Sequence, residues 1–145
     1  MYDSQSLFLF PNQLIIAKSE KFKLYGKSLT KLCYKSKEEN SERRLRSNRL
    51  GWQSKKKDYH KEPEFKEFFD DFNEMFSHCL EHEFNVKDHV TYNIVGSFIQ
   101  LSPPNAFNYS HIHPKEGLTC VFYVKIPENS GNIAFGCPDV HILNN

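Results

Sequence analysis

The fold is decided by residues 63–84, which read PEFKEFFDDFNEMFSHCLEHEF. Apolar side chains recur through this stretch with a period near 3.6 residues, and Pro63 suits the first turn of a helix. The recurring positions are Phe65, Phe68, Phe69, Phe72, Met75, Phe76, Cys79, Leu80 and Phe84. We therefore predict a long amphipathic helix here, with its apolar stripe packed on a sheet rather than reserved for a ligand.

Upstream of this helix the chain shows two weaker patterns. Residues 6–10 are mostly apolar and predict a short strand. A first helix is expected across residues 20–36, because apolar residues recur there at the spacing of one helical face: Tyr25, Leu29, Leu32 and Cys33. The polar and charged stretch 36–57 that follows predicts an exposed connection.

Downstream of His89 the sequence becomes rich in β-branched and aromatic residues. Such residues favour strands, and we expect strands over 90–95 and 97–101, separated by Gly96. Further strands fit residues 109–113, 117–126 and 132–135, with turn residues between them. Helices followed by closely spaced short strands predict an α+β fold with an antiparallel sheet.

The length of 145 residues predicts a single domain. Residues 1–88 would form its helical part, including a charged connector at 36–60, and residues 89–145 its β part. A formal net charge of +1 supplies no bulk field toward nucleic acid or anionic lipid. The 13 Phe and 7 Tyr residues are enough for an aromatic core, which argues against disorder over most of the chain.

The four cysteines, at positions 33, 79, 120 and 137, form no Cys-x-x-Cys pair and no spacing typical of zinc, so we predict free buried thiols. The apolar run 7–10 ends at Pro11 and is too short for a signal sequence or a membrane span. We therefore expect a cytoplasmic, reducing setting and no membrane association.

The most specific local motif is His111-Ile112-His113. Side chains alternate along a strand, so the two imidazoles would project from the same face and could share one metal ion. Imidazole binds iron, zinc, copper and nickel alike. Seven histidines in this length also generate such a pair by chance, so the motif alone leaves a metal site and an accidental pair equally open.

Two longer stretches resemble a family of Fe(II)- and 2-oxoglutarate-dependent oxygenases. Residues 101–138 resemble its Pro-Gly-like corner before His-x-His-Pro, its strand ending in Tyr-Tyr-Val-x-x-Pro and its Gly-x-Ile/Val-x-Phe strand before a proline. Residues 47–54, SNRLGWQS, resemble the family's Ser-Asn-x-x-Gly-Trp-x-Ser element. The agreement extends over most of residues 45–138.

This resemblance implies a jelly roll, also called a double-stranded β-helix, with Fe(II) held first by His111 and His113. His113 would stand where the wider superfamily uses Asp. The implied activity is a dioxygenase, an oxidoreductase that hydroxylates a C–H bond with 2-oxoglutarate as co-substrate. Asn108, Tyr123 and Lys125 are the candidates for contacts with that co-substrate.

The sequence also departs from the family. Family members continue through further strands that supply a distal His ligand and an Arg for the far carboxylate of 2-oxoglutarate. Here His141 is the remaining histidine for the third ligand, although it follows His113 by only 28 residues, and Asp139 is a rival donor. The arginines lie upstream, at positions 43, 44, 46 and 49, and Lys115 and Lys125 are the cations after His111. The roll would thus be incomplete, and a homodimer formed through its open sheet edge could complete it.

Three other interpretations remain beside the oxygenase. The chain could be a truncated, non-catalytic relative that serves as a binding or assembly module. The basic run 43–57 could contact phosphates, but its acidic neighbours favour a solvated connector, so the sequence does not favour nucleic-acid binding. His78 and His82 are i, i+4 neighbours that could bind a metal, although a polar helix surface is the simpler reading. Whether the substrate is a small molecule or a protein stays undetermined.

Overall fold

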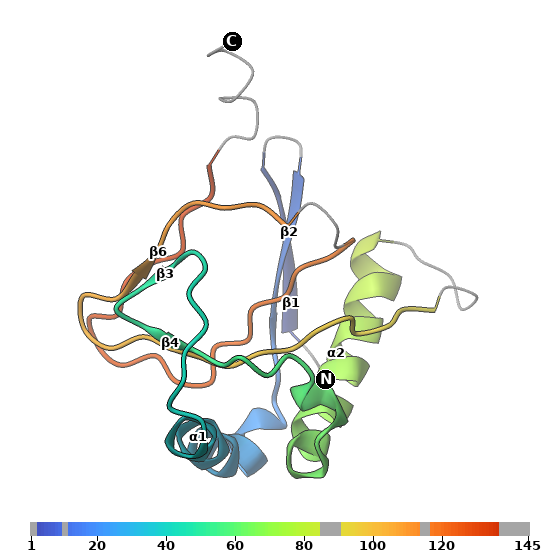
Figure 1. Ribbon diagram of the computed structural model, residues 1–145. Helices are drawn as coiled ribbons and strands as arrows, with labels where there is room; N and C mark the ends of the chain where they lie inside the picture. The colour runs from blue at the N-terminus through green and yellow to red at the C-terminus, as the bar shows by residue number, and fades with distance from the viewer. Residues whose placement is uncertain (1–2, 10–11, 85–90, 114–116, 137–145) are drawn as a thin grey trace.

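The computed structural model describes residues 3–9, 12–84, 91–113 and 117–136, and all structural statements concern these residues. The chain runs from two antiparallel strands through one helix, two short strands and a second helix into a largely extended C-terminal part (Figure 1). The elements are β1 (Asp3–Leu9), β2 (Asn12–Lys18), α1 (Phe22–Glu39), β3 (Asn48–Arg49), β4 (Trp52–Gln53), the 3-10 helices η1 (Tyr59–Lys61) and η2 (Pro63–Phe65), α2 (Lys66–Phe84), β5 (Gln100–Leu101) and β6 (Phe107–Asn108).

The N-terminal strand is longer than predicted and has a partner. β1 pairs antiparallel with β2 over seven residue pairs, from Asp3 opposite Lys18 to Leu9 opposite Asn12. β2 was not predicted, because the apolar run of the predicted strand ends at Pro11. A proline removes one backbone donor, but it does not prevent the chain from folding back into a second strand.

Both predicted helices are confirmed. α1 begins just after Ser19, whose Oγ accepts a hydrogen bond from Phe22 N at 3.2 Å. The predicted Pro63 start is a 3-10 turn, η2, which leads directly into α2 and its end at Phe84. Neither described helix is apolar enough over a long enough stretch to cross a lipid bilayer.

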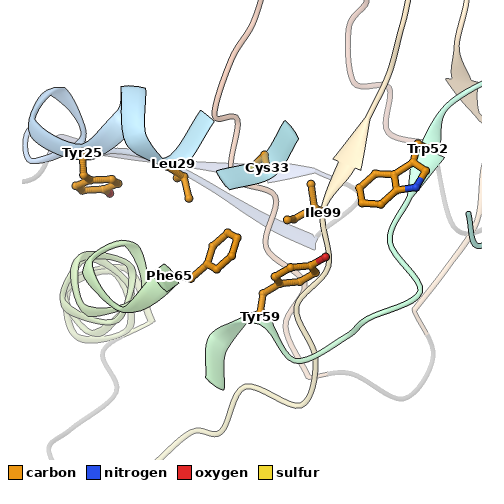
Figure 2. Packing of buried hydrophobic residues seen from close by; sticks show 7 residues of the cluster. All are labelled: Tyr25, Leu29, Cys33, Trp52, Tyr59, Phe65 and Ile99. Atoms are coloured by element: carbon orange, nitrogen blue, oxygen red, sulfur yellow. The ribbon is translucent and has the colours of Figure 1, made fainter. Parts of the chain in front are cut away.

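The core lies between the helices and the short ladders. Figure 2 shows Tyr25, Leu29 and Cys33 of α1 facing side chains from three other segments. Those partners are Phe65, Tyr59, Ile99 and Trp52. The extended segment that follows position 117 adds Phe122, whose ring lies 4.8 Å from Phe68 and 5.4 Å from Phe22, centre to centre. The prediction that the stripe is core is confirmed for its first part, where Phe65 is buried and Phe68 and Phe69 pack against the cluster. Phe72 and Phe76, further along α2, are partly exposed.

The thiol prediction is confirmed for two cysteines. Cys33 and Cys79 are free and buried, and burial raises the pKa of the Cys33 thiol to about 11. Cys120 is free but exposed, so the prediction of burial is wrong there. Cys137 lies outside the described residues.

The expectation that residues 36–57 form an exposed connection is wrong for its second half. Asn48 and residues 51–54 are buried, and Trp52 is 4% exposed. The stretch as a whole is highly charged, but it contains a short uncharged run that pairs with a distant segment of the chain. The lysines, the residues around Glu42 and the two exposed pairs 45–46 and 49–50 form the solvated surface that composition predicts.

The α+β class is confirmed, but the described residues form three two-stranded sheets and do not show a jelly roll. Of the strands predicted after position 89, only 97–101 takes part in a ladder, through β5, and residues 91–95 form no strand. β6 was not predicted. Segments 109–113, 117–126 and 132–135 are not strands, because no described segment supplies the facing N–H and C=O groups. Burial still alternates along residues 121–125, with Phe122 and Val124 packed on the core and Tyr123 directed outward.

A buried carboxylate joins the start of α1 to α2. Asp71 is 4% exposed, and its Oδ2 accepts hydrogen bonds from Ser19 Oγ at 2.5 Å and from the Tyr25 hydroxyl. Burial, followed by the contact with Asp71, raises the pKa of Tyr25, so the phenol stays protonated as the donor. This network fixes the two helices against each other through three polar side chains.

We expect Asp71→Ala to lower the free energy of unfolding by about 2 to 4 kcal/mol, because two buried hydroxyls lose their acceptor. The matched control is Asp70→Ala, one residue earlier, where the carboxylate is exposed and pairs with Lys66 across one helical turn. That control should cost less than about 1 kcal/mol. Urea unfolding followed by circular dichroism measures both, and equal losses would contradict a structural role for the buried network.

Candidate functional site

The two stretches that resemble the oxygenase family pack directly on each other. β3 pairs antiparallel with β6, placing Asn48 opposite Asn108 and Arg49 opposite Phe107. β4 pairs antiparallel with β5, placing Trp52 opposite Leu101. Both ladders lie on the same side of the molecule in Figure 1. The segment 47–54 is thus the structural support of the chain that leads to the histidine pair.

The turn between β3 and β4 is held by Asn48, which is 1% exposed. Its Oδ1 accepts a hydrogen bond from Arg46 N at 2.9 Å, and its Nδ2 donates to Gly51 O at 3.4 Å. Leu50 has a φ of 60°, in the left-handed region. At Gly51 a Cβ would lie 3.2 Å from Leu101 O, so a side chain would press on the backbone of β5. The Asn and Gly of this element therefore serve packing and turn formation.

Ser54 ends the element and joins it to the segment before β5. Its backbone N donates to Ile99 O at 2.9 Å, and its Oγ accepts from Ile99 N at 3.1 Å. The same hydroxyl donates to Lys56 O at 2.9 Å. Ser54 is 1% exposed, so every polar group that it buries has a partner. Trp52 contributes in a similar way, because its Nε1 donates to Asn40 O at 3.1 Å.

After β5 the chain turns and reaches the histidines. Ala106 N donates to Pro103 O at 3.0 Å, and Asn105 has a φ of 67°, which asparagine tolerates better than most residues. β6 follows, and one more bond, from Tyr109 N to Ser47 O at 2.9 Å, extends the contact with β3. His111 and His113 come two and four residues later.

The two imidazoles lie next to each other. Their ring centres are 5.1 Å apart, with planes inclined at 58°, and both side chains are exposed. A metal–nitrogen bond of about 2.1 Å puts each ring centre about 3.2 Å from the ion, so two imidazoles on one ion have centres about 4.5 to 5.2 Å apart for ligand angles of about 90° to 109°. The observed separation of 5.1 Å falls within that range.

A backbone contact fixes which nitrogen of His111 faces outward for binding. His111 Nδ1 lies 2.8 Å from Tyr109 O. A carbonyl only accepts hydrogen bonds, so Nδ1 carries the proton and Nε2 presents its lone pair. A hydrogen bond of this kind orients metal-binding histidines in many proteins. His111 is therefore arranged as an Nε2 ligand.

The other predicted site residues lie in different surroundings. Asn108 is in β6, exposed and opposite Asn48, and Tyr123 is 53% exposed. Lys125 Nζ lies 5.9 Å from the centre of the Tyr34 ring on α1. His141, Asp139 and Lys115 lie outside the described residues. Within the described ranges no group of three or more His, Cys, Asp or Glu side chains is placed to hold a metal.

Arg49 is a residue that the sequence analysis set aside as too far upstream. Its Cζ lies 4.5 Å from the centre of the Tyr109 ring, and its Nη1 donates to Arg46 O at 3.0 Å and Asn48 O at 2.9 Å. The pairing of β3 with β6 brings this cation beside the segment that carries the histidines. Nothing in the sequence gives the register of that pairing, so no sequence signal identified Arg49.

We expect Ser54→Ala to destabilise the protein by about 1 to 3 kcal/mol, because the buried Ile99 N and Lys56 O lose their partner. Ser28→Ala, on the exposed surface of α1, is the matched control and should change stability by less than about 0.5 kcal/mol. Chemical unfolding measures both variants. Faster amide hydrogen exchange at Ile99 in Ser54→Ala would locate the effect, and unchanged exchange there would contradict it.

No family model, no curated protein and no solved structure matches this chain at a significant level. The resemblance to the oxygenases therefore depends on the residues quoted above, and any activity assigned to the chain is a proposal.

Proposed function

We propose that this chain is part of an Fe(II)- and 2-oxoglutarate-dependent oxygenase of the hydroxylase type, with His111 and His113 as the first two metal ligands. The observation that carries the proposal is the pair of adjacent imidazoles, 5.1 Å apart between ring centres, with Nε2 of His111 presented for binding. The substrate, a small molecule or a protein, is left open.

The packing of the two resembling stretches supports the proposal. Residues 47–54 and 101–138 both resemble the family, and parts of the two stretches are neighbours through β3–β6 and β4–β5. Gly51 lies close against Leu101 across this contact.

The donor set fits part of an iron site. Two neutral imidazoles are suitable ligands for Fe(II), and a facial site needs one further donor. We propose His141, with Asp139 as the rival, acting in its own chain or across a dimer; both residues lie outside the described ranges. The segment 117–126, in which burial alternates along residues 121–125, would then be a strand of a jelly roll completed by pairing with a further segment or a second copy.

Several residues around the histidine pair have a definite role in this proposal. The iron, when bound, supplies the oxidising chemistry with dioxygen and 2-oxoglutarate. The carbonyl oxygen of Tyr109 holds His111 in one tautomer. The ring of Tyr109 is in turn covered by the Arg49 guanidinium. Asn108, Tyr123 and Lys125 would contact the co-substrate.

A second candidate function is a non-catalytic binding or assembly module related to these oxygenases. It is favoured by the large apolar side chains that the C-terminal part exposes. Ile112 is 78% exposed, Val121 61% and Ile126 63%, and the backbone around them is outside the ladders. Exposed apolar surface beside unpaired backbone is typical of a segment that pairs with another chain.

The metal site is tested by anaerobic titration of the tag-free chain with Fe(II). We expect His111→Ala and His113→Ala each to weaken binding by about 10- to 100-fold or more, because each removes a direct ligand. Ile112→Ala is the matched control, since this exposed side chain lies between the two histidines and has no ligand atom. Equal affinity in all three variants would reject the site.

Turnover separates the two candidate functions. The oxygenase predicts succinate formed from 2-oxoglutarate with Fe(II) and dioxygen, and its loss in His111→Ala and His113→Ala but not in Ile112→Ala. Iron binding that depends on both histidines without any succinate favours the non-catalytic module. Absence of both binding and succinate removes the oxygenase proposal.

A further inference from the structure

A second pair of imidazoles lies on α2, far along the sequence from the first pair. His78 and His82 are one helical turn apart, and their ring centres are separated by 4.2 Å with planes inclined at 49°. The pair lies beside the buried Met75 and Cys79 on α2, with His78 partly exposed. The His82 side chain is 55% exposed, and solvent and ions can reach it.

The two rings are close enough to share one ion, because their centres lie 4.2 Å apart on successive turns of one helix. Imidazole nitrogen binds copper, nickel and zinc alike, so the order of affinities among the divalent ions decides which of them binds most tightly.

We propose that His78 and His82 form a surface site for a late divalent transition metal, and that it binds Cu²⁺ in preference to Ni²⁺ and Zn²⁺. Cu²⁺ is first in the affinity order of the divalent series for nitrogen and oxygen ligands. The two imidazoles occupy neighbouring positions, and water occupies the others.

Local charge favours a cation at this position. Glu81 Oε2 lies 4.0 Å from His82 Nε2, close enough for the carboxylate to attract the ion or to accept a hydrogen bond from one of its waters. The helix itself preorganises the two ligands, because residues four apart lie on the same face one turn above each other. An ion bound there links two turns of α2 and stabilises the helix against unfolding.

The inference is independent of the proposed oxygenase, and the experiment keeps the two apart. The tag-free chain carrying His111→Gln and His113→Gln is titrated with Cu²⁺, Ni²⁺ and Zn²⁺ by calorimetry, with visible absorbance reporting nitrogen coordination of Cu²⁺. The same background with His78→Gln and His82→Gln added is the test variant. Glutamine keeps a polar side chain of similar reach at these surface positions.

We expect one Cu²⁺ per chain in the background variant, weaker binding of Zn²⁺, and a loss of Cu²⁺ affinity of at least about tenfold when His78 and His82 are replaced. Glu81→Gln should cause a smaller loss. Thermal unfolding with and without Cu²⁺ gives a second readout, a rise in the melting temperature that disappears with the two histidines. No binding in the background variant, undiminished binding in the test variant, or tighter binding of Zn²⁺ than of Cu²⁺ would each overturn the proposal.

Discussion

The antiparallel contact between residues 48–54 and 99–108 is the constraint on which the rest of the structure depends. It joins a segment before α2 to a segment after it, so α2 is enclosed in a closed loop of chain. Trp52 and Ile99 come from the two sides of this contact and both enter the core beside α1. The same contact carries the chain onward through β6 to His111 and His113. Without it, neither the core nor the histidine pair would have a defined position.

Polar side chains rather than apolar ones close this contact. Asn48 and Ser54 are each 1% exposed. Each side chain both donates and accepts a hydrogen bond. Between the helices the buried carboxylate of Asp71 acts as an acceptor only, for the hydroxyls of Ser19 and Tyr25. Among the described residues no buried side-chain nitrogen or oxygen lacks a hydrogen-bond partner. Buried polar groups that are satisfied only in one arrangement select that arrangement over others that bury the same apolar area.

The two histidine pairs illustrate how the supporting element sets the geometry of a ligand pair. His78 and His82 are fixed by the rise of a helix, which brings the ring centres to 4.2 Å. His111 and His113 lie on an extended segment where side chains two apart point the same way, and their centres are 5.1 Å apart. The backbone thus sets how close the two imidazoles of each pair come before any third ligand is considered.

The sequence by itself determined the helices, the α+β class and the adjacency of His111 and His113. These features follow from local periodicity, because a period of 3.6 or of two residues fixes which side chains share a face. Only the tertiary structure decided that Asn48 and residues 51–54 are buried, that β1 has a partner in β2 and that Arg49 lies beside Tyr109. Strand pairing depends on the meeting of segments distant in the chain, and a charged stretch such as 36–57 gives no local sign of its partner. The expected strands after position 109 could not be judged from their residues for the same reason, since β-rich composition supplies only one side of a ladder.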